Sequence, residues 1–182
     1  MNYILIGKPN VGKSSLFNFL TSSKRNIIHI EDGTTRDWHK DTIKGTNSYI
    51  FDTPGIIFKG KNLTLIFKDL FNRFLKNKSF IFIYVIDYNE GFNQIDYSNI
   101  NSLRKYDKEI ILLVNKFDNF KITPSNEFIQ YGMKKTIFTS CSHNYGIDEV
   151  KSLVNFTNKD KYEKDFNEHC SIAIFGKPNV GK

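Results

Sequence analysis

The sequence is poor in features that define several whole classes of protein. Its 182 residues include two cysteines, Cys141 and Cys170, which belong to no Cys-x-x-Cys pair. Two isolated cysteines exclude a disulfide framework and favour a reducing compartment. The four histidines are scattered along the chain, so the sequence shows no cluster with the spacing of metal ligands.

Long apolar runs are also missing. The most apolar stretch covers only residues 80–86, far short of the roughly 20 residues that span a bilayer. The first apolar stretch, residues 3–6, runs directly into a glycine-rich segment and leaves no room for a secretory signal peptide. These absences predict a soluble protein of the cytoplasm.

Acidic residues are outnumbered: 26 Lys and Arg stand against 19 Asp and Glu, a formal charge of +7. Such an excess fits a nucleic-acid partner, because phosphates attract a basic surface. It equally fits compositional drift, since Lys, Asn, Ile and Phe are all abundant and no run of Lys or Arg exceeds two residues. The charge alone leaves both interpretations open.

What the chain does have is an alternation of short β-rich runs and helical patterns. Strands are expected at residues 3–6, 38–44, 48–51, 80–86, 110–114 and 136–139, and helices at residues 13–20, 63–75, 95–105 and 147–156. The runs 80–86 and 110–114 are continuously apolar, which is typical of parallel strands covered on both faces. Residues 38–44 and 48–51 are expected to form the one antiparallel pair. The pattern predicts a mainly parallel, doubly wound α/β sheet.

One segment occurs twice. The heptamer Gly-Lys-Pro-Asn-Val-Gly-Lys is identical at Gly7–Lys13 and Gly176–Lys182. Identity over seven residues indicates a duplicated domain. We expect a first domain over residues 1–157, a charged linker over residues 158–169, and in residues 170–182 the strand and loop that start a second, truncated domain.

The repeated segment carries a phosphate-binding motif. Gly7–Ser14 fits G-x-x-x-x-G-K-[ST], the P-loop, and lies between a predicted strand and a predicted helix. Its backbone N–H groups and the start of the helix are expected to face phosphate oxygens. Lys13 is expected to reach the β- and γ-phosphates, and the Ser14 hydroxyl to bind Mg²⁺. The predicted phosphate contacts are Asn10, Val11, Gly12, Lys13, Ser14 and Ser15.

Two further segments suit a metal and the γ-phosphate. Asp52 ends a predicted strand in Asp-Thr-Pro-Gly, so it suits an outer-sphere Mg²⁺ partner, and Gly55 suits a γ-phosphate sensor. The polar segment 33–37 contains a threonine that would bind Mg²⁺ only when the γ-phosphate is present. We assign that role to Thr35, with Thr34 as the alternative.

The third element of the predicted site would select guanine. Asn115-Lys-Phe-Asp118 follows a buried strand, and the Asp118 carboxylate can accept hydrogen bonds from N1–H and the N2 amino group of guanine. A buried Asp118 would lose both partners with adenine, which discriminates against ATP. Asn115 would support the loop and the base, and the stem of Lys116 would cover the purine face. After the last strand, the backbone N–H groups of Ser140 and Cys141 would approach guanine O6.

Together these motifs, in this order, resemble the TrmE–Era–EngA group of translation-associated GTPases, and the repeated P-loop resembles the EngA/Der family with two tandem G domains. The resemblance implies a P-loop NTPase fold of the Ras-like G-domain kind: three layers and a mostly parallel six-stranded sheet with one antiparallel edge strand. The sequence departs from the family pattern at Lys8, Cys141 and Asn144, where the family has Arg, Ala and Gly.

The resemblance also implies hydrolysis of GTP with Mg²⁺, with Lys13, Thr35, Gly55 and Asn10 as catalytic residues. Asn10 would coordinate a K⁺ ion, as in relatives; alternatively it only stabilises its own loop. Ile56 and Ile57 stand where Ras-like proteins carry a water-orienting glutamine, so we expect slow intrinsic turnover.

The implied partners are the large ribosomal subunit and ribosomal RNA, with a second G domain and a KH-like domain elsewhere in the protein. Three alternatives stay open: a nucleotide-responsive RNA- or ribosome-binding module with incidental turnover, an Era-like GTPase, and an ATP-using P-loop enzyme.

Overall fold

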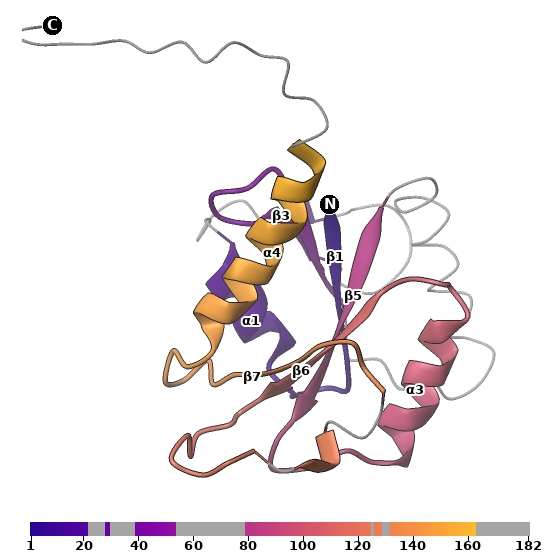
Figure 1. The fold of residues 1–182 in the computed structure, drawn as a ribbon, viewed down its shortest axis with the longest axis vertical. Helices are drawn as coiled ribbons and strands as arrows, with labels where there is room; N and C mark the ends of the chain where they lie inside the picture. The colour runs from indigo at the N-terminus through magenta and orange to yellow at the C-terminus, as the bar shows by residue number, and fades with distance from the viewer. Residues whose placement is uncertain (22–27, 30–38, 54–78, 125, 129–131, 163–182) are drawn as a thin grey trace, which may run out of the picture.

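In the computed structural model, the described residues are 1–21, 28–29, 39–53, 79–124, 126–128 and 132–162. They form one sheet in the order β2-β3-β4-β1-β5-β6-β7 (Figure 1). The strands are β1 Asn2–Ile6, β2 Ile28–His29, β3 His39–Thr42, β4 Tyr49–Asp52, β5 Phe80–Asp87, β6 Ile110–Asn115 and β7 Thr136–Phe138. The helices are α1 Lys13–Leu20, α3 Gln94–Arg104, α4 Ile147–Tyr162 and the short 3-10 helix η2 Asn126–Phe128.

The strand directions confirm the predicted fold class. β1 lies at the centre, parallel to β4 on one side and to β5 on the other, and β6 and β7 continue the parallel order. β3 pairs antiparallel with β4, as expected. The six expected strands are all present, and the two-residue β2 adds a seventh outside β3. A two-residue strand is too short to leave a periodic signal in the sequence.

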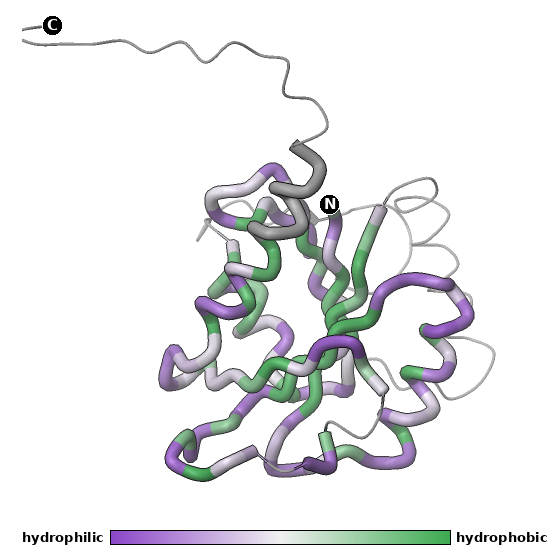
Figure 2. Tube along the Cα trace, viewed as in Figure 1, coloured by the Kyte–Doolittle hydropathy of each residue, from purple (hydrophilic) through white to green (hydrophobic). Residues whose placement is uncertain are grey.

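Both faces of the sheet are covered by helices, as the continuous apolar strands predicted. All eight residues of β5 are buried. Alternate side chains enter two cores: Ile83 and Val85 pack with residues of α1 and α4, whereas Phe82 and Tyr84 pack with residues of α3. Figure 1 shows α1 and α4 on one side of the sheet and α3 on the other, and Figure 2 shows the hydrophobic residues concentrated along the strands.

The helices agree with the predicted bounds except at the C-terminal end of α4. α1 covers residues 13–20 as predicted, whereas α4 continues to Tyr162, into the predicted linker at 158–169. Residues 158–162 are polar, so the sequence there has no apolar periodicity that would indicate a helix. The predicted helix at 63–75 and the second motif copy in 170–182 lie outside the described residues. No helix among the described residues has the length and hydropathy needed to cross a membrane.

Candidate nucleotide-binding site

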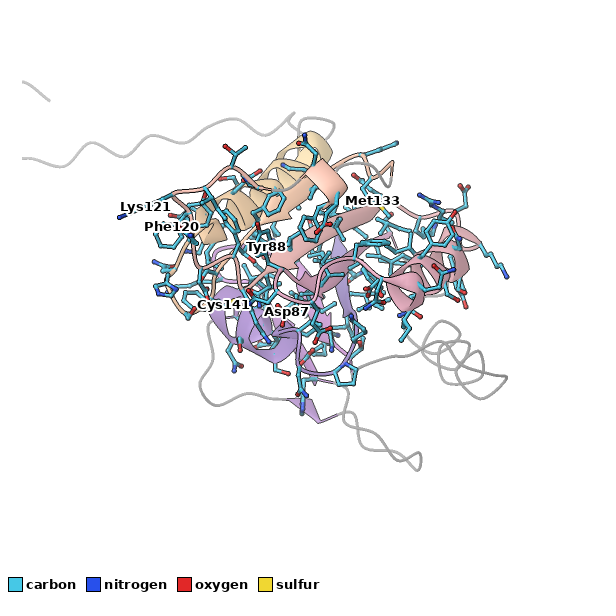
Figure 3. The ribbon with its side chains drawn as sticks, turned by 90° about the horizontal axis from the view of Figure 1, so that it is seen from below. Asp87, Tyr88, Phe120, Lys121, Met133 and Cys141 are labelled. Carbon is cyan, nitrogen blue, oxygen red and sulfur yellow. The ribbon has the colours of Figure 1, made fainter. Side chains whose placement is uncertain are left out.

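The predicted site residues gather at the carboxyl edge of the sheet. The loop after β1, the end of β4 and the end of β6 meet there, because parallel strands end at the same edge. Figure 3 views this edge, with Asp87 and Cys141 toward the middle and Phe120 and Lys121 at the periphery. A cavity of about 580 Å³ opens among these loops, lined by Pro9, Asn10, Gly12, Lys13, Ser14, Ser15, His39, Asp52, Thr53 and Lys116.

The P-loop is shaped by close contact with β6. Gly12 has φ +93°, and a Cβ placed there would lie 2.1 Å from the Asn115 side-chain nitrogen. Only glycine fits this position, because both the backbone conformation and the space exclude a side chain. Gly12 also precedes α1 as its N-cap and offers no side-chain cap. The first-turn N–H groups of α1 therefore suit a phosphate oxygen.

Lys13 is buried and held by the loop itself. Its Nζ donates to the carbonyl oxygens of Gly7 at 3.2 Å and Lys8 at 2.7 Å. Burial lowers the pKa of Lys13, and the nearby charge of Asp52 opposes that effect. The ammonium group thus lies beside the cavity and, among the described residues, has no hydrogen bond to a carboxylate, which suits a phosphate ligand.

Ser14 and Asp52 form the oxygen pair expected for a metal. The Ser14 hydroxyl donates to Asp52 Oδ2 at 2.7 Å. Asp52 is 4% exposed, and its Oδ1 is buried without a hydrogen bond among the described residues. Burial raises the pKa of Asp52, although the Ser14 hydrogen bond and the Lys13 charge oppose the rise. A buried carboxylate oxygen with no donor beside a hydroxyl is a fitting set for Mg²⁺, which takes oxygen ligands.

Several predicted residues lie outside the described part of the chain. They are Thr34, Thr35, Gly55, Ile56 and Ile57. Their assignments to the metal, the γ-phosphate and the absent glutamine stay predictions.

Asn115 links the phosphate end of the site to the base end. It is 2% exposed; its Nδ2 donates to the Val11 carbonyl at 2.9 Å, and its Oδ1 accepts from the Thr139 hydroxyl at 3.2 Å. Both polar groups of the side chain therefore hold protein loops. The arrangement supports the predicted role of Asn115 in the loop.

Lys116 makes a contact that the sequence did not suggest. Its Nζ lies 2.7 Å from Asp87 Oδ2, and its backbone has φ +61°. Asp87 ends β5 directly beside Asn115 in the register of β6. The signal that could have found Asp87 is its place at the end of the apolar run, since neighbouring parallel strands bring their last residues together. The ion pair fixes the Lys116 stem at the cavity wall.

The prediction that Asp118 is buried is wrong, since its side chain is 48% exposed. The loop leaves the sheet immediately after β6, so the carboxylate faces outward where a bound base would cover it. Oδ1 accepts from the hydroxyls of Ser140 at 2.6 Å and Ser142 at 3.2 Å, and lies 3.4 Å from His143 Nδ1.

These donors have two consequences for recognition. The Ser140 hydrogen bond is the main cause of a lowered pKa at Asp118, so the group is a carboxylate at neutral pH. Because the three contacts use Oδ1, no described residue contacts Oδ2, which suits a ligand. His143 belongs to this cluster, because its Nδ1 lies 3.1 Å from the hydroxyls of both Ser140 and Ser142.

Cys141 follows Ser140 in the loop after β7. Burial raises the pKa of its thiol to about 11, which argues against a reactive thiolate. The backbone of Ser140 exchanges two hydrogen bonds of 3.0 Å with Tyr145 and closes the loop. The Ser140 N–H is therefore already used within the loop, contrary to its predicted contact with guanine O6. Within the described residues, the Cys141 N–H donates to no protein acceptor, so it suits the predicted contact with guanine O6.

The fold, the P-loop at the β1–α1 junction and the carboxylate after β6 define the class of P-loop G domains. The chain belongs to the family described as 50S ribosome-binding GTPase, whose model matches residues 2–116.

The expected resemblance to the EngA/Der family is confirmed. The chain is 35% identical over 199 residues to GTPase Der of Buchnera aphidicola subsp. Schizaphis graminum, covering 98% of this chain and 43% of the relative. It is 34% identical over 185 residues to GTPase Der of Clostridium kluyveri, with coverages of 98% and 42%. The chain therefore spans less than half the length of these curated relatives.

Solved structures share the fold. The G domain of the FeoB iron transporter of T. maritima matches with a TM-score of 0.63 at 25% identity, covering 84% of this chain and 94% of that one. A GDP-bound NFeoB mutant from S. thermophilus matches with a TM-score of 0.67 at 21% identity, with coverages of 84% and 60%.

Proposed function

We propose that this chain binds GTP and hydrolyses it to GDP and phosphate, as a switch that acts in assembly of the large ribosomal subunit. The observation that carries the proposal is the double hydrogen bond of Asn115 to Val11 and Thr139. It joins the P-loop to the end of β7, so that the proposed phosphate-binding and base-binding loops are held by one side chain.

The proposed contacts follow the geometry of the cavity. The P-loop amides from Asn10 to Ser15 bind the phosphates together with Lys13. Ser14 holds Mg²⁺, with Asp52 in its outer sphere and Thr35 joining when the γ-phosphate is present. Bound Mg²⁺ would neutralise charge on the β- and γ-phosphates.

Beyond Lys116, which lines the cavity, Asp118 accepts from guanine N1–H and N2, Lys116 covers the ring, and the Cys141 N–H approaches O6. Two features support this orientation of the base: the Asp118 side chain is half-exposed, and among the described residues the Cys141 N–H has no acceptor.

Hydrolysis proceeds by in-line attack of water on the γ-phosphoryl group, which needs positioning and charge stabilisation more than covalent chemistry. Lys13 supplies positive charge at the phosphates, and Gly55 senses the γ-phosphate. Ile56 and Ile57 cannot orient water, so turnover is slow. Asn10, which lines the cavity, holds a K⁺ ion that raises the rate.

The ribosomal role is supported by the family description and by the relatives named GTPase Der. The charge of +7 is compatible with ribosomal RNA as partner. The repeated heptamer at Gly176–Lys182 supports a second G domain. A nucleotide-responsive binding module with incidental turnover remains the alternative, since Ile56 stands at the position of the water-orienting glutamine and Ile57 follows it.

Calorimetry with GTP, GDP and ATP in Mg²⁺ tests nucleotide binding. We expect both guanine nucleotides to bind and ATP to bind far more weakly; equal affinities would overturn the guanine assignment. Phosphate release in KCl and in NaCl, for the wild type and Asn10→Ala, tests hydrolysis. Faster release in KCl that is lost in Asn10→Ala supports the potassium site, and equal rates in all four conditions remove it.

Co-sedimentation with large ribosomal subunits separates the switch from the alternative. Binding that depends on the presence of a non-hydrolysable GTP analogue and is released on hydrolysis supports the switch. Binding and release that proceed unchanged in a variant that binds GTP but does not hydrolyse it favour the module.

A further inference from the structure

Lys8 occupies a P-loop position where the motif accepts any residue, yet it is 7% exposed. Its Nζ lies 2.7 Å from Glu90 Oε2 and 3.3 Å from Asp96 Oδ2. Both acids belong to the segment between β5 and the first turn of α3. Lys8 therefore ties the phosphate loop to an element on the other side of the sheet.

Asp96 is fully buried, and its two oxygens are committed. Oδ1 accepts from the Tyr84 hydroxyl at 3.0 Å, and Tyr84 in turn accepts from Asn99 Nδ2 at 2.9 Å. Oδ2 accepts from the backbone N–H of Asn93 at 3.2 Å, as part of the capping box that starts α3. A buried carboxylate requires a counter-charge, and among the described residues Lys8 supplies it.

The other end of Lys8 touches the predicted catalytic lysine. The Lys8 carbonyl accepts from Lys13 Nζ at 2.7 Å. One residue thus carries an ammonium fixed by α3 and a carbonyl that holds the ammonium of Lys13. Burial lowers the pKa of Lys8, but the hydrogen bond to Glu90 and the charges of Asp96 and Glu90 outweigh it, so the group stays charged.

We propose that Lys8 is a positioning residue for phosphate binding: its ammonium, held between Glu90 and Asp96, fixes the P-loop on the N-terminus of α3 and sets the position of Lys13. This inference rests on the proposed function, because it concerns the same phosphate site. It assigns a role to a side chain that touches no nucleotide. It also makes α3 a mechanical support of the phosphate loop.

The competing interpretation is that Lys8 contributes only to stability. Lys8→Met alone does not separate the two, because it leaves the Asp96 carboxylate buried without a counter-charge. The double variant Lys8→Met/Asp96→Asn removes both charges and keeps the overall shape. Lys8→Arg keeps the charge and serves as the rescue. Lys151→Met removes one partner of a surface ion pair with Asp148 and serves as the matched control.

The first measurement needs no nucleotide. Amide hydrogen exchange is compared between the peptide that spans residues 9–16 and the peptide of β5, residues 80–87. In the double variant we expect faster exchange of residues 9–16 only, with wild-type rates in Lys8→Arg and Lys151→Met. Equal acceleration of both peptides would show a purely structural role and overturn the inference.

The second measurement is the affinity for a fluorescent GDP analogue. The double variant is expected to bind about 10-fold to 100-fold more weakly, the scale of loss when a catalytic group is misplaced from a distance. Wild-type affinity in the double variant would overturn the inference while the proposed function stands. A wild-type chain that binds no guanine nucleotide would overturn the proposed function, and the exchange experiment would still decide whether Lys8 fixes the loop.

Discussion

Asp118 and Asp52 are both acids at the carboxyl edge of the sheet, but their surroundings move their pKa values in opposite directions. Hydroxyl donors around Asp118, Ser140 first, lower its pKa, whereas burial raises that of Asp52. The exposed acid is thus prepared to accept hydrogen bonds as a carboxylate. The buried acid, Asp52, would be stabilised in its ionised form by a bound cation.

Replacing Asp118 by Asn tests recognition of the base. An amide presents one acceptor and one donor, so it loses the hydrogen bonds to N1–H and N2 of guanine but complements the 2-oxo group of xanthine. We expect Asp118→Asn to weaken GDP binding by at least about 100-fold and to improve binding of xanthosine diphosphate. Titration with both nucleotides measures the change, and an unaltered preference for GDP contradicts the assignment.

The raised pKa of Asp52 predicts a dependence of stability on pH. Because the folded pKa lies above the ordinary value of 3.8, the stabilising contribution is complete below that value and is lost as pH rises through the folded pKa. In the absence of metal and nucleotide, the free energy of unfolding of the wild type should therefore fall relative to that of Asp52→Asn as the pH rises above about 4.

Urea denaturation at a series of pH values measures this difference. Asp107→Asn, at an exposed carboxyl in the same domain, serves as the control for the loss of one carboxyl group. Parallel curves for the wild type and Asp52→Asn would contradict the raised pKa.

At the scale of elements, strong periodicity made the prediction succeed. The helix α1 and the strands β1, β5 and β6 lie within one residue of their expected bounds, because their apolar residues repeat at helical spacing or run without interruption. β2 and the last turns of α4 were not predicted, since the first is too short for a pattern and the second is polar.

The candidate site, too, could be predicted only in part. The P-loop, Asp52 and the guanine motif could be predicted, because each is a short run of neighbouring residues. The contacts of Lys8 with Asp96 and of Lys116 with Asp87 could not, because each joins residues far apart in the sequence through the sheet. The exposure of Asp118 was also missed, since a motif gives no direction for its loop.

Two glycines allow a matched test of the P-loop. Gly12 and Gly45 both have positive φ, but a Cβ at Gly45 meets nothing within 4 Å, whereas one at Gly12 meets the Asn115 amide. Gly45→Ala should cost only the backbone strain, about 1 kcal/mol. Gly12→Ala should cost more and should also remove GDP affinity. Thermal melting and nucleotide titration of both variants measure this, and equal losses of stability with retained binding would contradict it.

At the scale of the whole molecule, the nucleotide would contact loops that leave β1, β4, β6 and β7, so binding and global stability should be linked. GDP at 100 times its dissociation constant should stabilise the fold by about 2.7 kcal/mol. For a chain of this size, that corresponds to a rise in melting temperature of about 5–10 °C.

Differential scanning calorimetry with GDP, ATP and no ligand measures the linkage. ATP at the same concentration should leave the melting temperature unchanged. A GDP-independent melting temperature at saturation would show that binding does not depend on the folded sheet.

The double hydrogen bond of Asn115 has a consequence for protein engineering. Transplanting residues 7–14 to another strand–helix junction would transfer the motif without the amide that satisfies the Val11 carbonyl and fills the space beside Gly12. The graft would need its own asparagine on the adjacent strand. The smallest portable unit of this site is therefore a pair of neighbouring strand ends, which no single contiguous peptide can supply.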